Sequence, residues 1–345
     1  MLLLKQSNQT MSSTTTTQSK LETPFTTAVR NTDVAFWRRY IAGRPAPTAA
    51  FYDLINEYHA SHSDGRTVVA HDVGTGPGNI AQKLLSHYDR VVGSDVNDKA
   101  LTAASLLASP EHLERLTFVN CPAEDLATAP IPSAVGVGHT DLVVVSECMP
   151  LLDAPRALRA FHSLLRPGGT LAAYFYGRPI FVDDDADALN AAYETLATRV
   201  CSFLLPFKGT PGFPFHQRGA EGLASYLDNI ALPAGEWGAV ERRKWNCDHP
   251  LLFNGVEGFD FEVVPVDRRG PEETERRVVD RGFWAEEWDA ERVEAYLLSV
   301  YPGAREKAGE RYQELEGLLT DLRKRMGGGV RKVTFSAVLI MATRK

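Results

Sequence analysis

The sequence predicts an α/β fold built on a mostly parallel sheet. From residue 34 onward, short apolar runs alternate with stretches of helical period, which is the pattern of strands joined by crossover helices. A loop with three glycines follows the first apolar run, at the strand-to-helix position where such sheets bind ligands. With 345 residues, 44% of them hydrophobic, the chain is long enough for one large domain or two ordinary ones.

Each expected element follows from its own pattern. Residues 48–60 place Phe51, Leu54, Ile55 and Tyr58 on one face of a helix. The helix expected at 153–169 should stop at the Pro-Gly-Gly sequence that closes this range, because helices commonly end at such sequences. The expected strands are 67–73, 90–96, 116–121, 140–147 and 170–177, and the expected helices are 48–60, 78–88, 98–109 and 153–169.

The regular alternation ends after Pro179. An aromatic, Pro- and Gly-rich segment and two charged helices, at about 285–300 and 304–326, come next, and 332–345 reads as a closing strand. If this strand returns to the sheet, residues 29–345 form one unit with an inserted helical substrate cap, mainly 178–326. Residues 1–28 are polar and Ser/Thr-rich, so we expect a disordered tail.

Composition excludes several classes of function. The net charge of -7 provides no excess of positive charge that would bind nucleic acid or anionic membranes. No apolar run reaches transmembrane length. Four cysteines lie far apart without a CxxC pair or a Cys/His cluster, which predicts reduced thiols and no metal site. We therefore expect a cytoplasmic protein that acts on a small molecule; the oligomeric state is left open.

The glycine loop is the main functional signal. Gly74, Gly76 and Gly78 form GxGxG, whereas a dinucleotide fingerprint would need a glycine where Asn79 stands. Asp72 at the mouth of the loop would repel a pyrophosphate but suits a ligand with an ammonium group. The second expected strand also carries an acid at its end, where both ribose hydroxyls of an adenosine are commonly bound.

These motifs carry a family resemblance. "HDVGTGPGN", "VVGSDVN", "CPAEDL", "DLVVVSECMPLLD" and "LLRPGGTLAAY" stand in the order and spacing of the class I S-adenosylmethionine-dependent methyltransferases. The chain most resembles the fungal trans-aconitate methyltransferase-like group and its relatives in secondary metabolism. The resemblance implies a Rossmann-like seven-stranded sheet, mostly parallel with an antiparallel last strand, and S-adenosylmethionine as cofactor.

The resemblance also implies roles for individual residues. Asp72 would orient the methionine end of the cofactor, Asp95 would hold the ribose, and Val96 would pack on the adenine. Two departures stand out: Pro122 replaces a frequent polar residue, and Met149 begins an apolar run where relatives carry a His-Trp pair, which argues against trans-aconitate as substrate. The other implied cofactor positions are Tyr40, Arg44, Gly74, Thr75, Gly76, Ala123, Glu124 and Ser146.

The sequence holds no obvious acid/base pair. Methyl transfer from a sulfonium can proceed largely by proximity and orientation, so a protein base is not obligatory. His216 is the candidate base, although a lone loop histidine is more often structural. The candidate substrate residues are Glu147, Tyr176, Phe213 and Phe215.

The expected function is methyl transfer to an oxygen, nitrogen or sulfur nucleophile of a carboxylic acid or a fungal secondary metabolite. Two alternatives stay open. One is a protein that binds the cofactor without transferring its methyl group, as a pericyclic catalyst or a regulator. The other is an NAD(P)-dependent oxidoreductase, which Asp72 and Asn79 disfavour.

Overall fold

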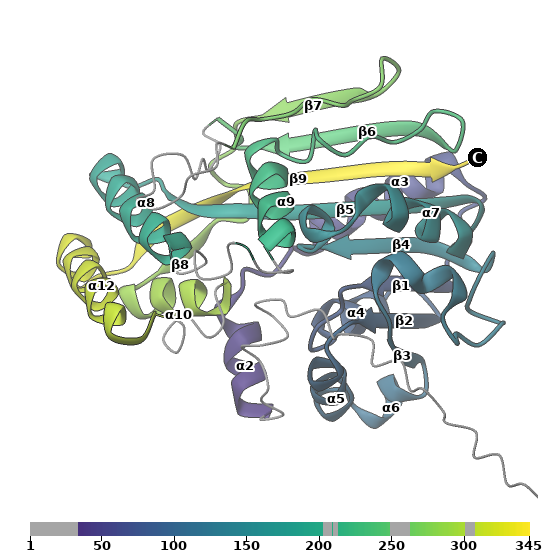
Figure 1. Ribbon diagram of the computed structural model, residues 1–345, viewed down its shortest axis with the longest axis horizontal. Coiled ribbons are helices and arrows are strands. Elements are labelled where there is room, and N and C mark those ends of the chain that lie inside the picture. Colours follow the sequence, from purple (N-terminus) through teal and green to yellow (C-terminus); the bar gives the residue numbers. More distant parts are fainter. Residues whose placement is uncertain (1–33, 203–208, 210–212, 249–262, 301–307) are drawn as a thin grey trace, which may run out of the picture.

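The computed structural model describes residues 34–202, 209, 213–248, 263–300 and 308–345. Within these ranges nine strands form one sheet in the order β3-β2-β1-β4-β5-β9-β6-β7, with β8 paired to β9 (Figure 1). The strands are β1 (Val69–Val73), β2 (Arg90–Asp95), β3 (Leu116–Asn120), β4 (Thr140–Ser146), β5 (Leu165–Phe181), β6 (Trp237–Trp245), β7 (Thr274–Val278), β8 (Glu286–Trp288) and β9 (Arg331–Arg344).

Helices connect and cover these strands. The α-helices are α2 (Val34–Gly43), α3 (Ala49–His62), α4 (Asn79–Leu84), α5 (Asp98–Leu107), α6 (Pro110–Leu113), α7 (Ala154–Leu164), α8 (Ala186–Ser202), α9 (Phe213–Ala224), α10 (Ala290–Val300) and α12 (Tyr312–Met326). Short 3-10 turns are η1 (Ala123–Thr128), η2 (Met149–Leu151) and η4 (Gly309–Arg311).

The parallel part of the sheet fixes where a ligand can bind. β1 pairs in parallel with β2 and β4, and β4 with β5, so their carboxyl ends meet at one edge. β9 runs antiparallel to β5 and β6. This confirms the predicted α/β sheet with an antiparallel last strand. The predicted count of seven was low, because β7 adds to β6 and β8 adds to β9.

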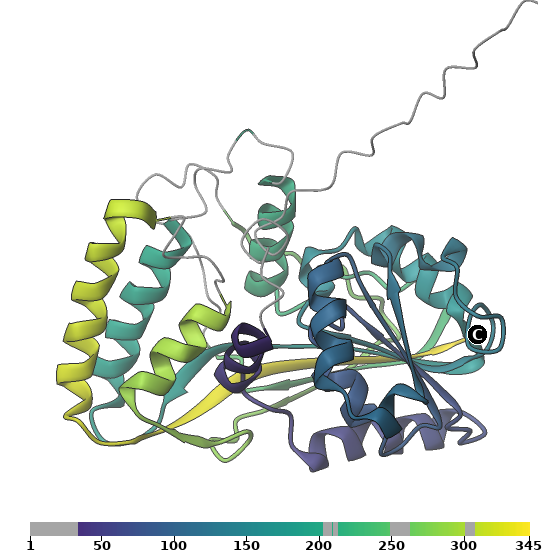
Figure 2. The same ribbon diagram turned by 90° about the horizontal axis from the view of Figure 1, so that it is seen from below.

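The core lies on both faces of the sheet. Along β4, Leu142 and Val144 join one buried cluster, whereas Val143 and Val145 join the other, as the two-residue period of a strand requires. α3 contributes to the first cluster and α7 to the second. In Figure 2 the purple α3 and the teal α7 lie on opposite sides of the sheet.

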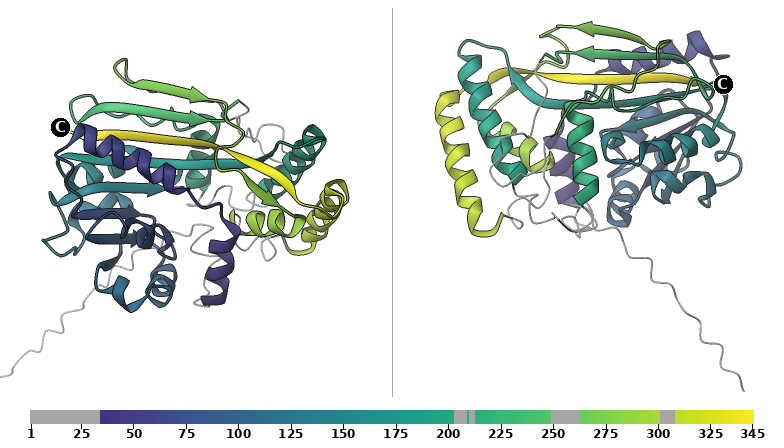
Figure 3. Two further views of the ribbon diagram at one scale, coloured as in Figure 1. Left: turned by 180° about the vertical axis from the view of Figure 1, so that it is seen from behind. Right: turned by 45° about the horizontal axis from the view of Figure 1, so that its top comes forward.

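Two long strands carry the sheet beyond its parallel part. β5 has 17 residues and β9 has 14, and the helices α8, α10 and α12 gather at their far end (Figure 3). α8 packs against α12, and α10 packs against α2. The segment 178–326 was expected to be a helical cap, but it supplies strands β6, β7 and β8 as well as helices. The expected tail, 1–28, lies outside the described residues.

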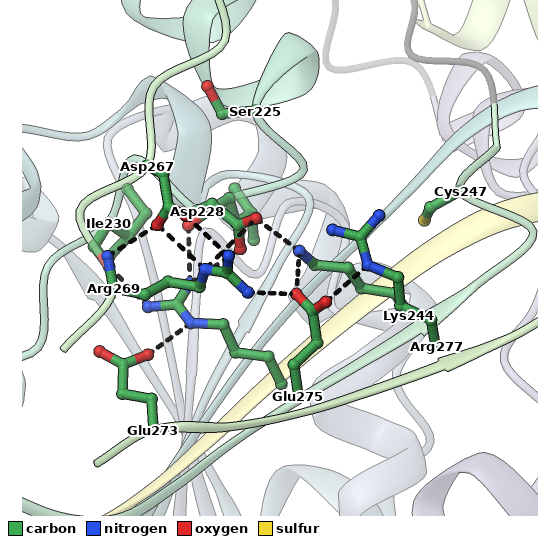
Figure 4. Close-up of polar contacts among 12 residues, drawn as sticks. Ser225, Asp228, Ile230, Lys244, Cys247, Asp267, Arg269, Glu273, Glu275 and Arg277 are labelled. Carbon is green, nitrogen blue, oxygen red and sulfur yellow. Dashed lines mark hydrogen bonds and ion pairs between the residues drawn. The ribbon is translucent and has the colours of Figure 1, made fainter. Parts of the chain in front are cut away.

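A buried charge network joins β6 to β7 (Figure 4). The Lys244 ammonium, whose side chain is 0% exposed, donates to Asp228 and Glu275 at 2.6 Å each. The equally buried Arg242 donates from Nε to Glu273 at 2.6 Å. Buried charges persist only where partners of opposite charge offset their desolvation, and here β7 and the 225–230 turn supply those partners.

Candidate functional site

The glycine loop connects β1 to α4 and bends back over the end of β2. The backbone N–H groups of Gly74 and Thr75 both donate to the Ser94 carbonyl, at 2.8 and 2.9 Å. A Cβ at Gly74 would lie 2.6 Å from the sulfur of Cys148, which follows β4. The segment after β4 can therefore approach the loop only because Gly74 lacks a side chain. Gly76 has a φ of +53°, and a Cβ added there would meet nothing within 4 Å, which leaves open space above the loop.

Asp95 ties the end of β2 to this loop. Its Oδ2 accepts from the Gly76 N–H at 2.8 Å, and its Oδ1 accepts from the Asn97 N–H, also at 2.8 Å. Burial raises the pKa of the Asp95 carboxyl, whereas these backbone donors lower it. The neighbouring Val96 is 49% exposed, so an apolar side chain stands uncovered beside a half-buried acid.

Asp72 lies fully buried beneath the loop. Its Oδ2 accepts from the Thr75 hydroxyl at 2.6 Å, and its Oδ1 has no hydrogen-bond partner among the described residues. Burial raises the pKa of Asp72 to about 7, while the Thr75 hydroxyl and the backbone N–H of Ala81 act in the opposite direction. An unsatisfied buried carboxylate oxygen is costly, and a nearby cation would offset that cost.

The residues predicted to lie at the adenine edge, Ala123 and Glu124, begin η1. Ala123 is buried, and Glu124 Oε1 accepts from the Asp153 N–H at 2.9 Å, which joins η1 to the start of α7. Ser146 is the last residue of β4 and is half-buried. These three residues therefore surround the same edge of the sheet as the glycine loop.

Arg44 is the centre of a second group of predicted residues. Its guanidinium donates to the Tyr176 hydroxyl and the Tyr40 hydroxyl at 3.2 Å each, and to the Ser299 carbonyl at 3.1 Å. Its Nη1 also lies 3.8 Å from Glu147 Oε2. Four predicted residues thus meet, although they were assigned to different ligands: Tyr40 in α2, Arg44 just after α2, Glu147 just after β4, and Tyr176 in β5.

Glu147 follows β4 directly and has an unusual backbone. Its φ of +63° lies in the left-handed region that non-glycine residues rarely adopt. Glu147 Oε1 accepts from the Tyr176 N–H at 2.8 Å. Burial raises the pKa of Glu147 to about 8, against the opposing effects of Arg44 and the Tyr176 N–H.

Helix α9 lies beside this strand end. Gly219 and Gly222 face η2, where a Cβ would come within 2.8 Å of Leu151 and 2.7 Å of Pro150. Half-buried Phe213 and Phe215 lie in its first turn. His216 is on the same helix, but its side chain lies outside the described residues, so its predicted role stays untested.

Two residues of α10 were missed by sequence reasoning. The Tyr296 hydroxyl donates to the Gly177 carbonyl at 2.9 Å, and the Ser299 carbonyl accepts from Arg44. Ser299 is 255 residues from Arg44, and no sequence motif links the two. Gly43 offers a local signal, because a Cβ there would lie 2.6 Å from the Ala295 carbonyl oxygen.

The described ranges contain no grouping of three His, Cys, Asp or Glu side chains that could hold a metal ion. Within the same ranges, no helix combines the length and apolarity that a membrane span requires.

Comparison with known proteins identifies the family. A family model described as a methyltransferase domain matches residues 70–169. Methyltransferase ptaI of Pestalotiopsis fici is 56% identical over 335 residues, covering 96% of this chain and 99% of that protein. Methyltransferase cfoB of Aspergillus candidus is 36% identical (90% and 95% covered), as is methyltransferase pgmE of Aspergillus terreus (90% and 93% covered). The chain therefore belongs to the class I S-adenosylmethionine-dependent methyltransferases, in one group with these fungal methyltransferases.

Proposed function

We propose that this methyltransferase acts on a small molecule, a fungal secondary metabolite, held at the carboxyl ends of β1, β2, β4 and β5. The observation that carries the proposal is the glycine loop: Gly76 leaves open space above its backbone, and Asp95 accepts from its N–H. A glycine-rich loop at the carboxyl ends of parallel strands suits a ligand that approaches the backbone closely.

The residues present fit the cofactor of the family. The half-buried Asp95 would bind the ribose hydroxyls, and the exposed Val96 would pack on the adenine. The unpartnered Oδ1 of Asp72 gives the methionine end a buried negative charge. Gly74, Thr75, Gly76, Ala123, Glu124 and Ser146 complete the proposed contacts, with Tyr40 and Arg44 on the N-terminal side.

When bound, S-adenosylmethionine supplies a methyl group on a positively charged sulfur, which is a strongly activated carbon. The chain's contribution is then mainly to hold the acceptor in line with that carbon and to exclude water. Glu147, Tyr176, Phe213 and Phe215 are the proposed substrate contacts, because they lie on β5, at the end of β4 and on the adjacent α9. His216 remains a proposed base.

The alternatives are separable by binding and by product. Calorimetry with S-adenosylmethionine and with NADH should give binding for the first ligand alone; binding of NADH would favour an oxidoreductase. Release of S-adenosylhomocysteine from a mixture of fungal metabolites is the test of transfer. Binding without release would favour a cofactor-bound protein that performs no methyl transfer.

Asp95→Ala is expected to weaken S-adenosylmethionine binding about tenfold or more, because charge-assisted hydrogen bonds contribute roughly 1.5–3 kcal/mol each. The control is Asp98→Ala, which removes an exposed carboxylate three residues away. Calorimetry on both variants measures the effect. Equal dissociation constants for the two variants would contradict the ribose role of Asp95.

Cofactor binding is expected to release protons near pH 7. The pKa of Asp72 is about 7 in the free protein, and a bound cation would lower it by favouring the carboxylate. Affinity should therefore rise between about pH 6 and pH 8 and then level off. Calorimetry at about pH 7 in two buffers of different ionisation enthalpy counts the protons. Asp72→Asn should release fewer protons than the wild type, and an identical count would contradict the contact.

A further inference from the structure

Helix α9 contacts η2 through two glycines. A Cβ added at Gly222 would lie 2.7 Å from Pro150 Cβ and 3.1 Å from Pro150 Cα. Three residues earlier, a Cβ at Gly219 would lie 2.8 Å from Leu151 Cδ2. Arg218 fixes this alignment, because its Nε and Nη2 donate to the Leu151 carbonyl at 3.3 and 3.1 Å. Both glycines are buried, so α9 lies closer to η2 than residues with side chains would permit.

The residue before η2 packs against the glycine loop. The Cys148 thiol donates to the Val73 carbonyl at 3.3 Å, and its sulfur lies 2.6 Å from the position that a Cβ of Gly74 would take. Beneath the loop, the buried Oδ1 of Asp72 has no hydrogen-bond partner among the described residues, which points to a ligand bound here. The segment 148–151 therefore contacts both the proposed cofactor loop and α9, and it sets the distance between them.

The buried charge network of Figure 4 holds the turn that follows α9. Arg242 donates from Nη1 to the Leu227 carbonyl at 2.8 Å and from Nη2 to the Ile230 carbonyl at 2.7 Å. Tyr226 and Leu227 have φ values of +49° and +60°, a backbone that non-glycine residues adopt only where neighbouring contacts enforce it. The carboxyl end of α9 is therefore fixed to β6 by a buried cation.

The first turn of α9 carries two of the proposed substrate contacts, Phe213 and Phe215, and both side chains are half-buried. Residues four apart share a face of a helix, so Phe215 lies on the face of Gly219. Phe213 is nine residues from Gly222, which is roughly 14 Å at 1.5 Å per residue. Because the turn after α9 is fixed, a tilt of the helix about that end moves Phe213 further than Gly222.

We propose that Gly222 is a specificity-determining residue: its contact with Pro150 sets the distance between α9 and the end of β4, and with it the size of the acceptor that is held in line with the methyl group. This inference rests on the proposed function. Productive geometry has to be held within roughly 0.5 Å, so a small displacement of α9 changes which acceptor fits. Gly219 has a weaker effect, because Leu151 Cδ2 is the end of a flexible side chain, whereas Pro150 Cα belongs to the backbone.

The first test needs no acceptor. In Gly222→Ala, α9 has to move by roughly 0.7 Å, the difference between 2.7 Å and the 3.4 Å at which ordinary contact begins. Crystal structures of the full-length wild type and of Gly222→Ala, each with S-adenosylhomocysteine, should show this shift and a larger one at Phe213. The control is Gly317→Ala in α12, where a Cβ meets nothing within 4 Å. An unmoved α9 in Gly222→Ala would overturn the proposal.

The second test measures the choice of acceptor. Each protein is incubated with labelled S-adenosylmethionine and an organic extract of a Pestalotiopsis fici culture, and the labelled products are sorted by mass. Gly222→Ala should form the main wild-type product at least about tenfold more slowly, the lower end of the effect of one methylene, and should gain heavier products. Its affinity for S-adenosylhomocysteine should be unchanged, and Gly317→Ala should match the wild type. An unchanged ratio of products in Gly222→Ala would overturn the proposal, even at lower turnover, because a general structural defect slows all products alike.

Gly219→Ala decides the question if Gly222→Ala does not fold. Its methyl group meets only Leu151 Cδ2, so the product ratio should shift in the same direction by about threefold, less than one methylene usually gives. Leu151→Ala removes that atom, and the double variant should return the ratio of Leu151→Ala alone. A Gly219→Ala ratio equal to that of the wild type, or one that Leu151→Ala does not restore, would overturn the proposal. A wild type that binds S-adenosylhomocysteine but labels no product would contradict the proposed function, and this inference with it.

Discussion

Gly76→Val is expected to lower the affinity for S-adenosylmethionine at least about a hundredfold, which corresponds to roughly 2.7 kcal/mol. Two physical effects combine. The φ of +53° is unfavourable for a β-branched residue, and the valine side chain would fill the open space above the loop. The Gly76 N–H, which donates a hydrogen bond to Asp95 Oδ2, would also shift. Calorimetry on the folded variant measures the loss.

The matched control for this variant is Gly65→Val. Gly65 has a φ of +72°, has nothing within 4 Å of a Cβ position, and lies on the surface before β1. Its valine variant carries the same backbone strain away from the site. Both variants should lose similar stability, but only Gly76→Val should lose cofactor binding. Normal affinity in Gly76→Val would show that the loop does not contact the cofactor.

Lys244→Met is expected to lower the free energy of unfolding by about 3 kcal/mol, the lower end of the range for breaking a buried ion pair. The variant leaves Asp228 and Glu275 without the ammonium that donates to both at 2.6 Å (Figure 4). Arg269 also pairs with Glu275, at 2.6 Å, which limits the loss. Denaturant unfolding at about pH 7 measures the change.

Two further variants make this result interpretable. Lys99→Met breaks an exposed pair with Asp98 and should cost less than about 1 kcal/mol. Adding Asp228→Asn to Lys244→Met removes the acid whose 2.6 Å ion pair is lost and whose remaining cations lie 3.7 and 3.8 Å away, so it should restore part of the stability. If Lys244→Met and Lys99→Met were equally stable, the network would not hold β7 on β6.

The parallel half of the fold was predictable because its signals are local. The strands expected at 67–73 and 140–147 each contain a run of consecutive apolar residues, at 68–70 and 142–145, which is what burial on both faces requires. The structure places β1 at Val69–Val73 and β4 at Thr140–Ser146. The glycine loop and the acid at the end of β2 were also predictable from the sequence. Gly76 lies just beyond β1, and Asp95 is the last residue of β2.

Strands β6 and β7 were not predicted, because their pattern is polar. Arg242 and Lys244 look like exposed residues in sequence but are fully buried. Their burial depends on Glu273 and Glu275, each 31 residues further along the chain, so no local period reveals it. The same reason applies to the site: Arg44 and Glu147 were each singled out, yet only the fold shows that they meet.

The most direct test of the account is a crystal structure of the full chain with S-adenosylhomocysteine. The account predicts the ligand at the carboxyl ends of β1 and β2, with both ribose hydroxyls within hydrogen-bond distance of the Asp95 carboxylate and the adenine against Val96. Density for the ligand elsewhere, or a ribose that does not contact Asp95, would contradict it.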